Sequence, residues 1–208
     1  MTYNQFREAI YDFAVFSIGD IAKIYPDFDS RRLVEWQQKG YLQKLVNKWY
    51  LFSDIVMDDL LRYRISNCLY KPSYISLESA LSHYNLIPEG VYTIQNITTR
   101  KTIMYETTSG SFYYRNIKPS VFFGYHVIRR NSFPVLMAEP EKAILDLLYL
   151  SPGIKTKSDI EGLRLNCNEL NVIINWEKLE KYAACYESAV LIKRVLLIQK
   201  LKAYANVI

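Results

Sequence analysis

Two short segments at the start of the chain place apolar residues at helical spacing. Apolar side chains three or four positions apart predict an amphipathic helix over residues 3–13. Ser17, followed three residues later by Asp20, predicts the capped start of a second helix. Pro26 predicts the end of that helix, because proline lacks the backbone N–H that a helix interior requires.

A third helix is expected after this proline. Asp29 or Ser30 can cap its first turn, and Lys39 followed by Gly40 is a typical C-terminal stop. Its expected apolar members are Leu33, Val34 and Trp36. At 100° per residue, Arg31, Glu35 and Lys39 fall on one line, with Arg32 and Gln38 beside it and Leu33, Trp36 and Gln37 opposite. The basic side of this helix is therefore expected to face solvent.

Two β-favouring runs follow the glycine. Residues 42–46 and 49–52 are separated by Asn47-Lys48, which is the length of a two-residue hairpin loop. Three short helices and a hairpin within about fifty residues give the outline of a winged helix-turn-helix. In that architecture the third helix enters the DNA major groove and the hairpin lies along the phosphates.

A further helix is expected from Ser53 to residue 71, where Pro72 ends it. We place the domain boundary there, with residues 1–71 as a winged helix-turn-helix domain and its connecting helix, and residues 72–208 as a second domain. The connecting helix could also pack on both domains.

The second domain begins with a short helical pattern over residues 76–85. After it, the spacing of similar residues changes to every second position, which is typical of strands. Five β-branched and aromatic runs between residues 91 and 138 predict an antiparallel sheet of about four or five strands. An amphipathic helix is expected from Pro140, and a helical tail over residues 151–208. In this tail Asn175 is expected to cap one helix, and residues 189–201 are apolar on most faces of a helix that we expect to be enclosed by the core or by a partner. The predicted fold class is α+β: an N-terminal winged helix-turn-helix, an α+β domain with an antiparallel sheet, and a helical C-terminal tail.

Composition excludes several classes of protein. Half of the 208 residues are apolar and 23% are charged, which is typical of a globular chain rather than a disordered one. No apolar run approaches the roughly 18–20 residues of a membrane span. The N-terminus also lacks the basic segment, apolar segment and small residues that follow one another in a signal peptide. Cys68, Cys167 and Cys185 are scattered, so we interpret them as small buried apolar residues in a reducing compartment. We therefore expect a cytoplasmic protein without membrane contact.

The net charge of +5 does not by itself indicate a nucleic-acid partner. Residues 1–71 hold ten basic and nine acidic side chains, so any DNA-binding surface depends on local placement. The candidate DNA-binding residues are Arg31, Arg32, Gln38, Lys39, Lys44 and Lys48. Arginine can form two hydrogen bonds to guanine, and glutamine can form two to adenine. The hairpin lysines can neutralise phosphates. Two alternatives stay open: a solvated, salt-bridged helix face, or a winged helix that contacts protein only.

The residues do not suggest catalysis. The sequence has no phosphate-cradling glycine loop, no paired cysteines or histidines for a metal, and no nucleophile elbow. Glu141 and Lys142 could be mistaken for a nuclease site, but they open a helix and point about 100° apart. For His83 and His126 we expect structural or surface roles. We therefore expect neither an enzyme nor a metal or cofactor.

Two motifs in the second domain carry a family resemblance. The segments YISLESAL (74–81) and AEPEKAILDLLYL (138–150), after a small winged-helix pattern, resemble the AbiEi family of antitoxins from type IV toxin-antitoxin systems linked to abortive phage infection. The resemblance covers residues 5–150, and the tail more loosely. The matching positions are Tyr74, Ser76, Ser79, Ala80, Leu81, Glu141, Lys142, Ala143 and Asp146.

The resemblance implies two functions. The N-terminal domain would bind operator DNA and repress its own operon, and the second domain would neutralise a nucleotidyltransferase-like toxin. One departure concerns the hairpin, where the family usually has an arginine-glycine turn and this chain has Asn47-Lys48.

The motif residues also have a structural interpretation, which we favour over direct contact with a toxin. Ser76 and Ser79 suit a cap and a small packing position. Glu141, Lys142 and Asp146 are expected on the outer face of their helix, with Lys142 and Asp146 as an i, i+4 pair.

Overall fold

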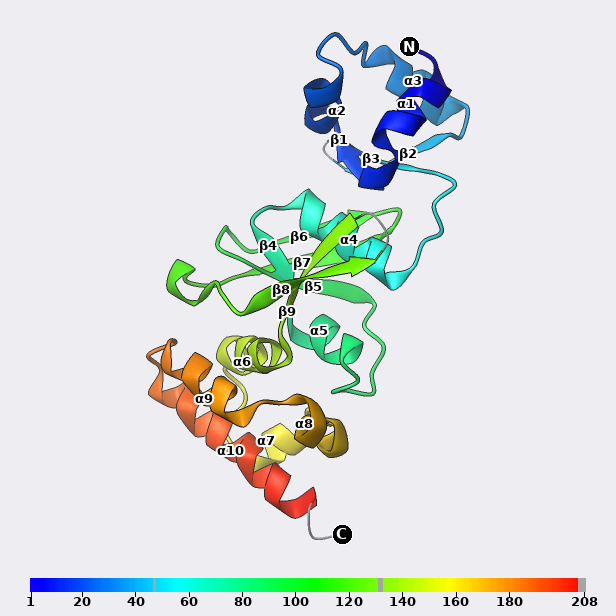
Figure 1. Cartoon of the computed structure of the whole chain (residues 1–208). Helices are drawn as coiled ribbons and strands as arrows, with labels where there is room; N and C mark the ends of the chain where they lie inside the picture. The colour runs from blue at the N-terminus through cyan, green and yellow to red at the C-terminus, as the bar shows by residue number, and fades with distance from the viewer. Residues whose placement is uncertain (47, 131–132, 206–208) are drawn as a thin grey trace.

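The computed structural model describes residues 1–46, 48–130 and 133–205, with backbone only at residue 130 and residues 201–205. The chain is a mixed α+β protein of elongated outline (Figure 1). Three helices and a small sheet lie at the N-terminal end, a larger sheet lies in the middle, and a group of helices lies at the C-terminal end. The first helix and the last helix of the chain are therefore at opposite ends of the molecule.

The N-terminal unit follows the expected order of helices. Its elements are α1 (Tyr3–Ile10), the 3-10 turn η1 (Tyr11–Phe13), β1 (Val15–Ser17), α2 (Ile18–Ile24), α3 (Arg31–Gln38), β2 (Leu42–Lys44) and β3 (Trp49–Phe52). The cap predicted at Ser17 is confirmed, because its hydroxyl accepts from the N–H of Asp20 and the Asp20 carboxylate accepts from the N–H of Ser17. The hairpin of β2 and β3 is also confirmed, whereas its loop residue Asn47 lies outside the described residues.

The small sheet contains a strand that the sequence pattern did not predict. β1 pairs antiparallel with β3, so the strand order is β1-β3-β2. The first helix is also shorter than expected, since its last turn is the 3-10 turn η1. Val34 was expected to be an apolar member of the third helix, but its side chain is 55% exposed. In a helix of eight residues only the narrow stripe of Leu33 and Trp36 reaches the core.

An aromatic core holds this unit together. The Phe6 ring lies 5.6 Å from the ring of Phe16, 4.7 Å from that of Trp36 and 6.0 Å from that of Phe52, so aromatic side chains of β1, α3 and β3 meet around α1. Edge-on and tilted ring pairs of this kind add to the hydrophobic gain from burial. The apolar side of α3 packs on this core, and its charged side faces solvent.

The larger sheet is mixed, which corrects the prediction of an antiparallel sheet of four or five strands. Its six strands have the order β6-β7-β5-β4-β9-β8, and the pairs β4·β9 and β5·β7 are parallel. The strands are β4 (Ser73–Ile75), β5 (Thr93–Thr98), β6 (Ile103–Thr107), β7 (Gly110–Asn116), β8 (Tyr125–Arg130) and β9 (Phe133–Ala138). β6 follows β5 in sequence but pairs only with β7, which lies between them. Alternation in the sequence identifies a strand and its faces, but not its pairing partner.

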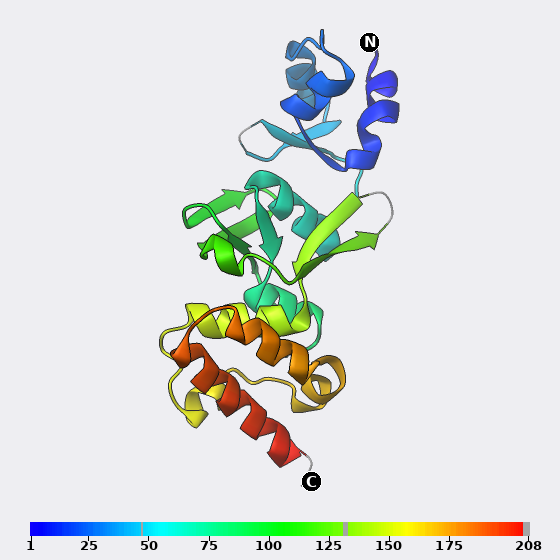
Figure 2. The ribbon, with the colours of Figure 1, turned by 60° about the vertical axis from the view of Figure 1, so that its left-hand side comes forward.

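Helices cover both faces of this sheet (Figure 2). On the face toward the N-terminal unit lies α4 (Asp59–Leu69), which packs on β9, β4 and β5 and also contacts β1. It begins at the cap Asp58 rather than at Ser53. On the opposite face lie α5 (Leu77–His83) and α6 (Pro140–Leu150). The expected packing of the connecting helix on both units is thus what the structure has.

The tail is helical, as predicted, and packs against α6. It consists of α7 (Lys157–Glu161), α8 (Cys167–Ile173), α9 (Trp176–Ala184) and α10 (Ala189–Ala205). The Asn175 side chain caps α9 by accepting from the N–H of Lys178 at 3.0 Å, as expected. We expected α10 to be enclosed on most faces. Instead Leu191, Val195 and Ile198 are buried, while Val190 and Leu196 are exposed.

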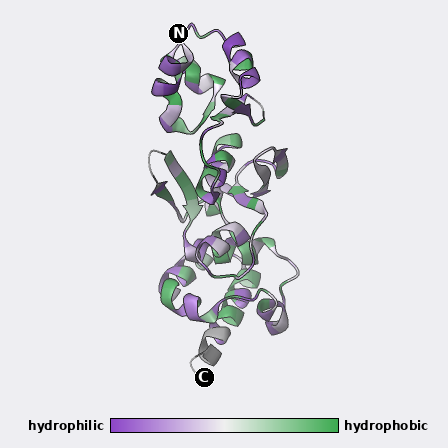
Figure 3. Cartoon of the chain, turned by 90° about the vertical axis from the view of Figure 1, so that its right-hand side faces the viewer, coloured by the Kyte–Doolittle hydropathy of each residue, from purple (hydrophilic) through white to green (hydrophobic). Residues whose placement is uncertain are grey.

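Hydrophobic residues follow the strands of the larger sheet and the helices beneath it, and hydrophilic residues lie on outward turns of the N-terminal helices (Figure 3). Among the described residues, no helix combines the length and apolar character that crossing a membrane requires. The interpretation of the cysteines was wrong in part, since Cys68 is buried but Cys185 is exposed.

Candidate functional site

The third helix presents its charged side to solvent. Asp29, just before the helix, accepts a hydrogen bond from the N–H of Arg31 at 3.0 Å and forms an ion pair with the Arg31 guanidinium at 2.8 Å. Ser30 occupies the N-cap position without a side-chain hydrogen bond, so of the two expected caps it is Asp29 that supplies the acceptor. The Arg31 side chain is 91% exposed. It is not packed against the second domain.

The end of α3 carries a second exposed ion pair. Lys39 donates to the Glu35 carboxylate at 2.6 Å, one helical turn away. This hydrogen bond raises the pKa of Lys39 and lowers the pKa of Glu35, so both groups stay charged at neutral pH. Gln38 is exposed beside them, and Gly40 ends the helix with a φ of +74°.

The hairpin places two further lysines in solvent. Lys44 on β2 and Lys48 before β3 are both exposed. The N–H of Trp49 donates to the carbonyl of Val46 at 2.9 Å, which closes the turn. Lys48 has a φ of +70°, a conformation that glycine adopts more easily. A lysine therefore occupies a turn conformation that favours glycine.

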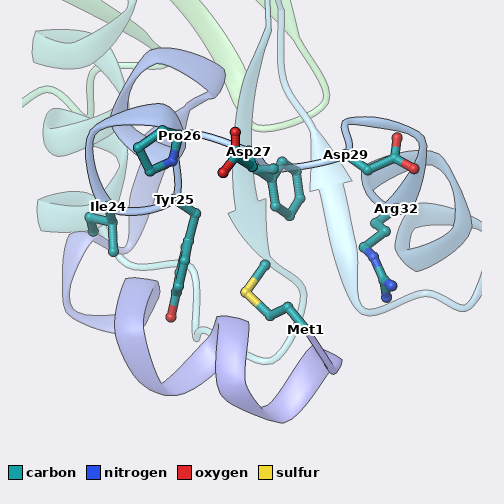
Figure 4. Close-up of a pocket in the computed structure, with 8 residues that line it drawn as sticks. Met1, Ile24, Tyr25, Pro26, Asp27, Asp29 and Arg32 are labelled. Carbon is teal, nitrogen blue, oxygen red and sulfur yellow. The ribbon is translucent and has the colours of Figure 1, made fainter.

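Arg32 is half-buried and lines a hollow of about 370 Å³ beside the first turn of α3. Figure 4 shows that the N-terminus, the turn between α2 and α3 and the start of α3 all contribute to its lining. The other lining residues are Met1, Ile24, Tyr25, Pro26, Asp27, Phe28 and Asp29. Within the described part of the chain the Arg32 guanidinium forms no ion pair, so it can still meet an anion.

The six predicted DNA-binding side chains thus lie on α3, at its C-cap and on the hairpin that follows, and α3 packs directly against β2. Their charged and amide groups are hydrogen-bond donors, which suit the acceptor-rich phosphates and base edges of DNA. Arg31 and Lys39 already have carboxylate partners. Exposed ion pairs are weak, so a phosphate can replace those carboxylates.

The two sequence motifs of the second domain meet in a buried polar cluster. One oxygen of Asp146 accepts from the Tyr74 hydroxyl at 3.0 Å and from the Ser76 hydroxyl at 2.8 Å. The other accepts from the Tyr186 hydroxyl at 2.8 Å and from the Lys142 ammonium group. We call these five residues the Asp146 cluster. It joins β4, the start of α5, α6 and the segment that follows α9.

The expectation that Glu141, Lys142 and Asp146 face outward was wrong. All three are buried, because α6 lies between α5 on one side and α9 and α10 on the other. Burial lowers the pKa of Lys142, since a charged ammonium group loses hydration there. The Asp146 carboxylate, which accepts from this ammonium group, and the Tyr186 ring, 4.9 Å from the Lys142 nitrogen, compensate for part of that loss.

The remaining acidic residues of the second motif hold α9. Glu141 accepts from the backbone N–H of Asn175 at 2.8 Å and pairs with Lys178 at 3.2 Å. Glu139 also pairs with Lys178, at 3.0 Å, and accepts from the Tyr182 hydroxyl at 2.7 Å. The carboxylates of this motif therefore bind the chain's own tail rather than facing a partner.

Ser79 is equally internal, since its buried hydroxyl accepts from the N–H of Gln95 at 2.8 Å. Ser76 stands at the N-cap of α5, as expected, but its hydroxyl donates to Asp146 instead of capping the helix. The motif side chains thus make internal contacts, although Ser76 does not cap the helix through its hydroxyl and the charged residues do not face outward. Sequence reasoning missed Tyr186, because nothing in its local pattern indicates a partner forty residues away.

Within the described residues, no group of three or more His, Cys, Asp or Glu side chains could hold a metal ion. His83 is exposed as a residue, but the rings of Tyr63 and Tyr84 cover part of its imidazole ring. Burial lowers the pKa of His83, so its neutral form is favoured. His126 is exposed on β8. No protein-family model matches the chain, and no curated protein matches it either.

Proposed function

We propose that the N-terminal unit is a winged helix-turn-helix that binds operator DNA. The observation that supports this most is the exposure of the basic side of α3, directly followed by a hairpin with two exposed lysines. In this proposal α3 enters the major groove and the hairpin lies along the phosphates. Arg31 and Gln38 would read bases, while Arg32, Lys39, Lys44 and Lys48 would mainly contact the backbone.

The test is a titration of the full chain with the promoter of its own gene, at several salt concentrations. Arg31→Ala with Arg32→Ala should weaken binding and flatten the salt dependence by about 0.9 on a log-log plot for each phosphate that is no longer neutralised. Lys118→Ala with Lys181→Ala removes the same charge far from α3 and should leave binding almost unchanged, since both lysines are exposed in the second domain. Equal binding by both double variants would exclude α3 as the contact surface.

We further propose that the chain is an autoregulatory repressor and an antitoxin that neutralises a nucleotidyltransferase-like toxin in the cytoplasm. This part rests on the resemblance of the two motifs to AbiEi antitoxins. Because the motif side chains are buried, we assign them the role of shaping the second domain rather than that of touching the toxin. Neutralisation can then proceed through another surface of that domain or through the toxin's target.

Co-expression tests the antitoxin role. The neighbouring reading frame is induced with and without this chain, and the expected result is a growth defect that the chain relieves. Arg31→Ala with Arg32→Ala should still relieve it when expressed from an unrelated promoter, because neutralisation is assigned to the second domain. A neighbour without toxicity would overturn the antitoxin proposal and leave DNA binding as a separate question.

A second candidate function is a winged helix that contacts only protein. The observation that favours it is the charge balance on α3, where Arg31 and Lys39 are paired with Asp29 and Glu35. The same promoter titration separates the two, because a protein-contact module would bind the promoter no better than unrelated DNA.

A further inference from the structure

A cleft lies between the small N-terminal sheet and the turn that joins β6 to β7. Its volume is about 550 Å³, which is within the usual range of small-molecule sites. Four segments form it: β2 and β3, the connection to α4, the start of α4, and the β6–β7 turn. Its lining residues are Gln43, Leu51, Ser53, Ile55, Met57, Arg62, Thr108, Ser109 and Gly110. An occupant would therefore contact both parts of the molecule.

The polar side of this cleft is rich in donors. Arg62 is exposed on the first turn of α4, and no ion pair engages its guanidinium within the described residues. None of the lining residues is acidic. Two nearby carboxylates are occupied, since Asp54 pairs with Arg7 at 2.6 Å and Asp58 caps α4 by accepting from the N–H of Leu61. The cleft therefore favours an anion.

Ser109 gives an independent indication of a missing partner. It is only 7% exposed, and across the described ranges its hydroxyl oxygen has no hydrogen-bond partner. Buried hydroxyls without a partner are rare in folded proteins, because the lost hydration is not replaced. The turn itself is well held, since the N–H of Ser109 donates to the Thr107 hydroxyl at 3.0 Å. Because Ser109 also lines the cleft, its unpartnered hydroxyl lies at the cleft wall.

The opposite side of the cleft is apolar. Leu51 is buried, while Ile55 and Met57 are partly buried and keep surface available to an occupant. Ligand sites typically combine an apolar wall with a few placed polar groups. An inorganic ion alone would leave this wall in contact with water.

We propose that this cleft binds a small phosphorylated organic molecule. The phosphate is held by the guanidinium of Arg62 and the hydroxyl of Ser109, and the organic part lies against Ile55 and Met57. A phosphate suits these groups because it offers several acceptor oxygens, and the planar fork of arginine can donate to two of them at once. This binding requires neither DNA nor a toxin, so it stands apart from the function proposed above.

Calorimetric titration of the full chain without DNA tests the proposal. The probes are adenosine monophosphate, cytidine monophosphate, glucose 6-phosphate, inorganic phosphate and unphosphorylated adenosine. We expect saturable binding of at least one organic phosphate. Inorganic phosphate and adenosine should bind at least about tenfold more weakly, because the first cannot cover the apolar wall and the second cannot accept from the guanidinium as an anion. No saturable binding of any organic phosphate at millimolar concentration would overturn the proposal.

Three variants locate the site. Arg62→Gln should weaken binding about tenfold or more, and Ser109→Ala about threefold to tenfold, as expected for a charged and a neutral hydrogen bond. Lys118→Gln removes an exposed charge elsewhere and should leave binding unchanged. Each variant is compared with the wild-type chain by circular dichroism and Tm, and Arg62→Lys retains the charge if Arg62→Gln alters the fold. Binding that is unaffected by both Arg62→Gln and Ser109→Ala would place the ligand outside this cleft.

Protection from proteolysis gives a second readout. The connection next to the cleft is open to a protease, since Val56 is 83% exposed. A ligand that contacts both sides of the cleft should slow cleavage there in the wild-type chain and not in Arg62→Gln. Equal cleavage with and without saturating ligand would contradict a site that bridges the two parts.

Discussion

Asp146 joins segments that are far apart in the sequence. Its carboxylate accepts hydrogen bonds from Tyr74, Ser76 and Tyr186 and pairs with Lys142, and all five side chains are shielded from water. A buried ion pair adds little net stability compared with an apolar pair, but removing one partner leaves an uncompensated charge. The ion pair therefore contributes little to the free energy of unfolding, but the cluster fixes the position of α6.

Asp146→Asn should destabilise the chain by about 3–5 kcal/mol, because the ammonium group of Lys142 loses its counter-charge in a buried site. Urea denaturation followed by circular dichroism measures the change. Glu177→Gln is the matched control, since it breaks an exposed i, i+4 pair with Lys181 and should have almost no effect.

A double variant tests whether the two charges act as a pair. Lys142→Met with Asp146→Asn should lose clearly less stability than the sum of the two single variants, because neither charge is then left alone. An Asp146→Asn variant within about 1 kcal/mol of the wild type would contradict the role assigned to this pair.

Gly124 lies against the same cluster and has a φ of +69°. A Cβ atom there would be 2.8 Å from the Tyr182 ring and 3.2 Å from the side chain of Lys142. Gly124→Ala should therefore cost about 1–3 kcal/mol from crowding alone, and the positive φ adds further strain. Gly153→Ala is the control, because nothing lies within 4 Å of its Cβ position. Thermal unfolding of both variants gives the comparison, and equal Tm values would contradict the close approach.

At the scale of elements, local signals set the ends of the helices. The capping boxes of Ser17 with Asp20 and of Thr156 with Asp159 each satisfy N–H groups that a helix end leaves unpaired. Burial alone would raise the pKa of Asp20, but hydrogen bonds from Ser17 hold it below its usual value. The stability that this carboxylate contributes is complete above its unfolded pKa and is lost as the pH falls through its folded pKa.

Ser17→Ala should lower the stability by about 1 kcal/mol at neutral pH, because α2 loses its cap. The difference from the wild type should shrink as the pH falls through the lowered pKa of Asp20, because the protonated carboxyl group no longer accepts charge-assisted hydrogen bonds from Ser17. Denaturation at a series of pH values measures both effects. Ser17→Asp supplies another acceptor and should recover most of the loss at neutral pH, whereas a constant difference across the pH range would contradict the linkage.

At the scale of the whole molecule, Arg194 attaches the tail to the centre. Its buried guanidinium donates to the carbonyls of Ile154 at 2.6 Å and Pro152 at 3.2 Å, and to that of Leu148 near the end of α6. A cation at this end also suits the helix dipole. This single side chain satisfies one carbonyl that the end of α6 leaves unpaired and two carbonyls of the connection that follows.

Arg194→Met should destabilise the chain by about 3 kcal/mol or more, since several buried carbonyls lose a charged donor. Hydrogen exchange should rise in α10 and near the end of α6, whereas promoter binding by α3 should be unchanged in conditions where the variant is folded. Lys193→Met, at the exposed neighbouring position, is the control and should leave stability almost unaltered. Similar unfolding curves for the two variants would contradict the assigned role of Arg194.

Local pattern determined much of the N-terminal unit in advance. The cap at Ser17, the glycine stop after α3 and the hairpin of β2 and β3 each depend on residues within about ten positions of one another. The exposed side of α3 was also predictable, because a helix repeats its faces every 3.6 residues. The candidate DNA-binding side chains were therefore found from the sequence, but their function is a proposal.

Tertiary contacts decided the rest. The alternation of residue types identified most strands. It did not predict the parallel pairing of β5 with β7 or the pairing of β1 with β3. The pattern within a strand shows which side chains share a face, but not which strand lies beside it. Lys142 and Asp146 were expected at the surface because charged residues are usually exposed. Only the packing of α9 and α10 over α6 makes them internal, and only that packing brings Tyr186 to Asp146. Near neighbours in the chain set the helix caps, the stop after α3 and the charged side of that helix, so these could be predicted from the sequence. Contacts between distant parts of the chain set which charges are buried and which segments meet, so these could not.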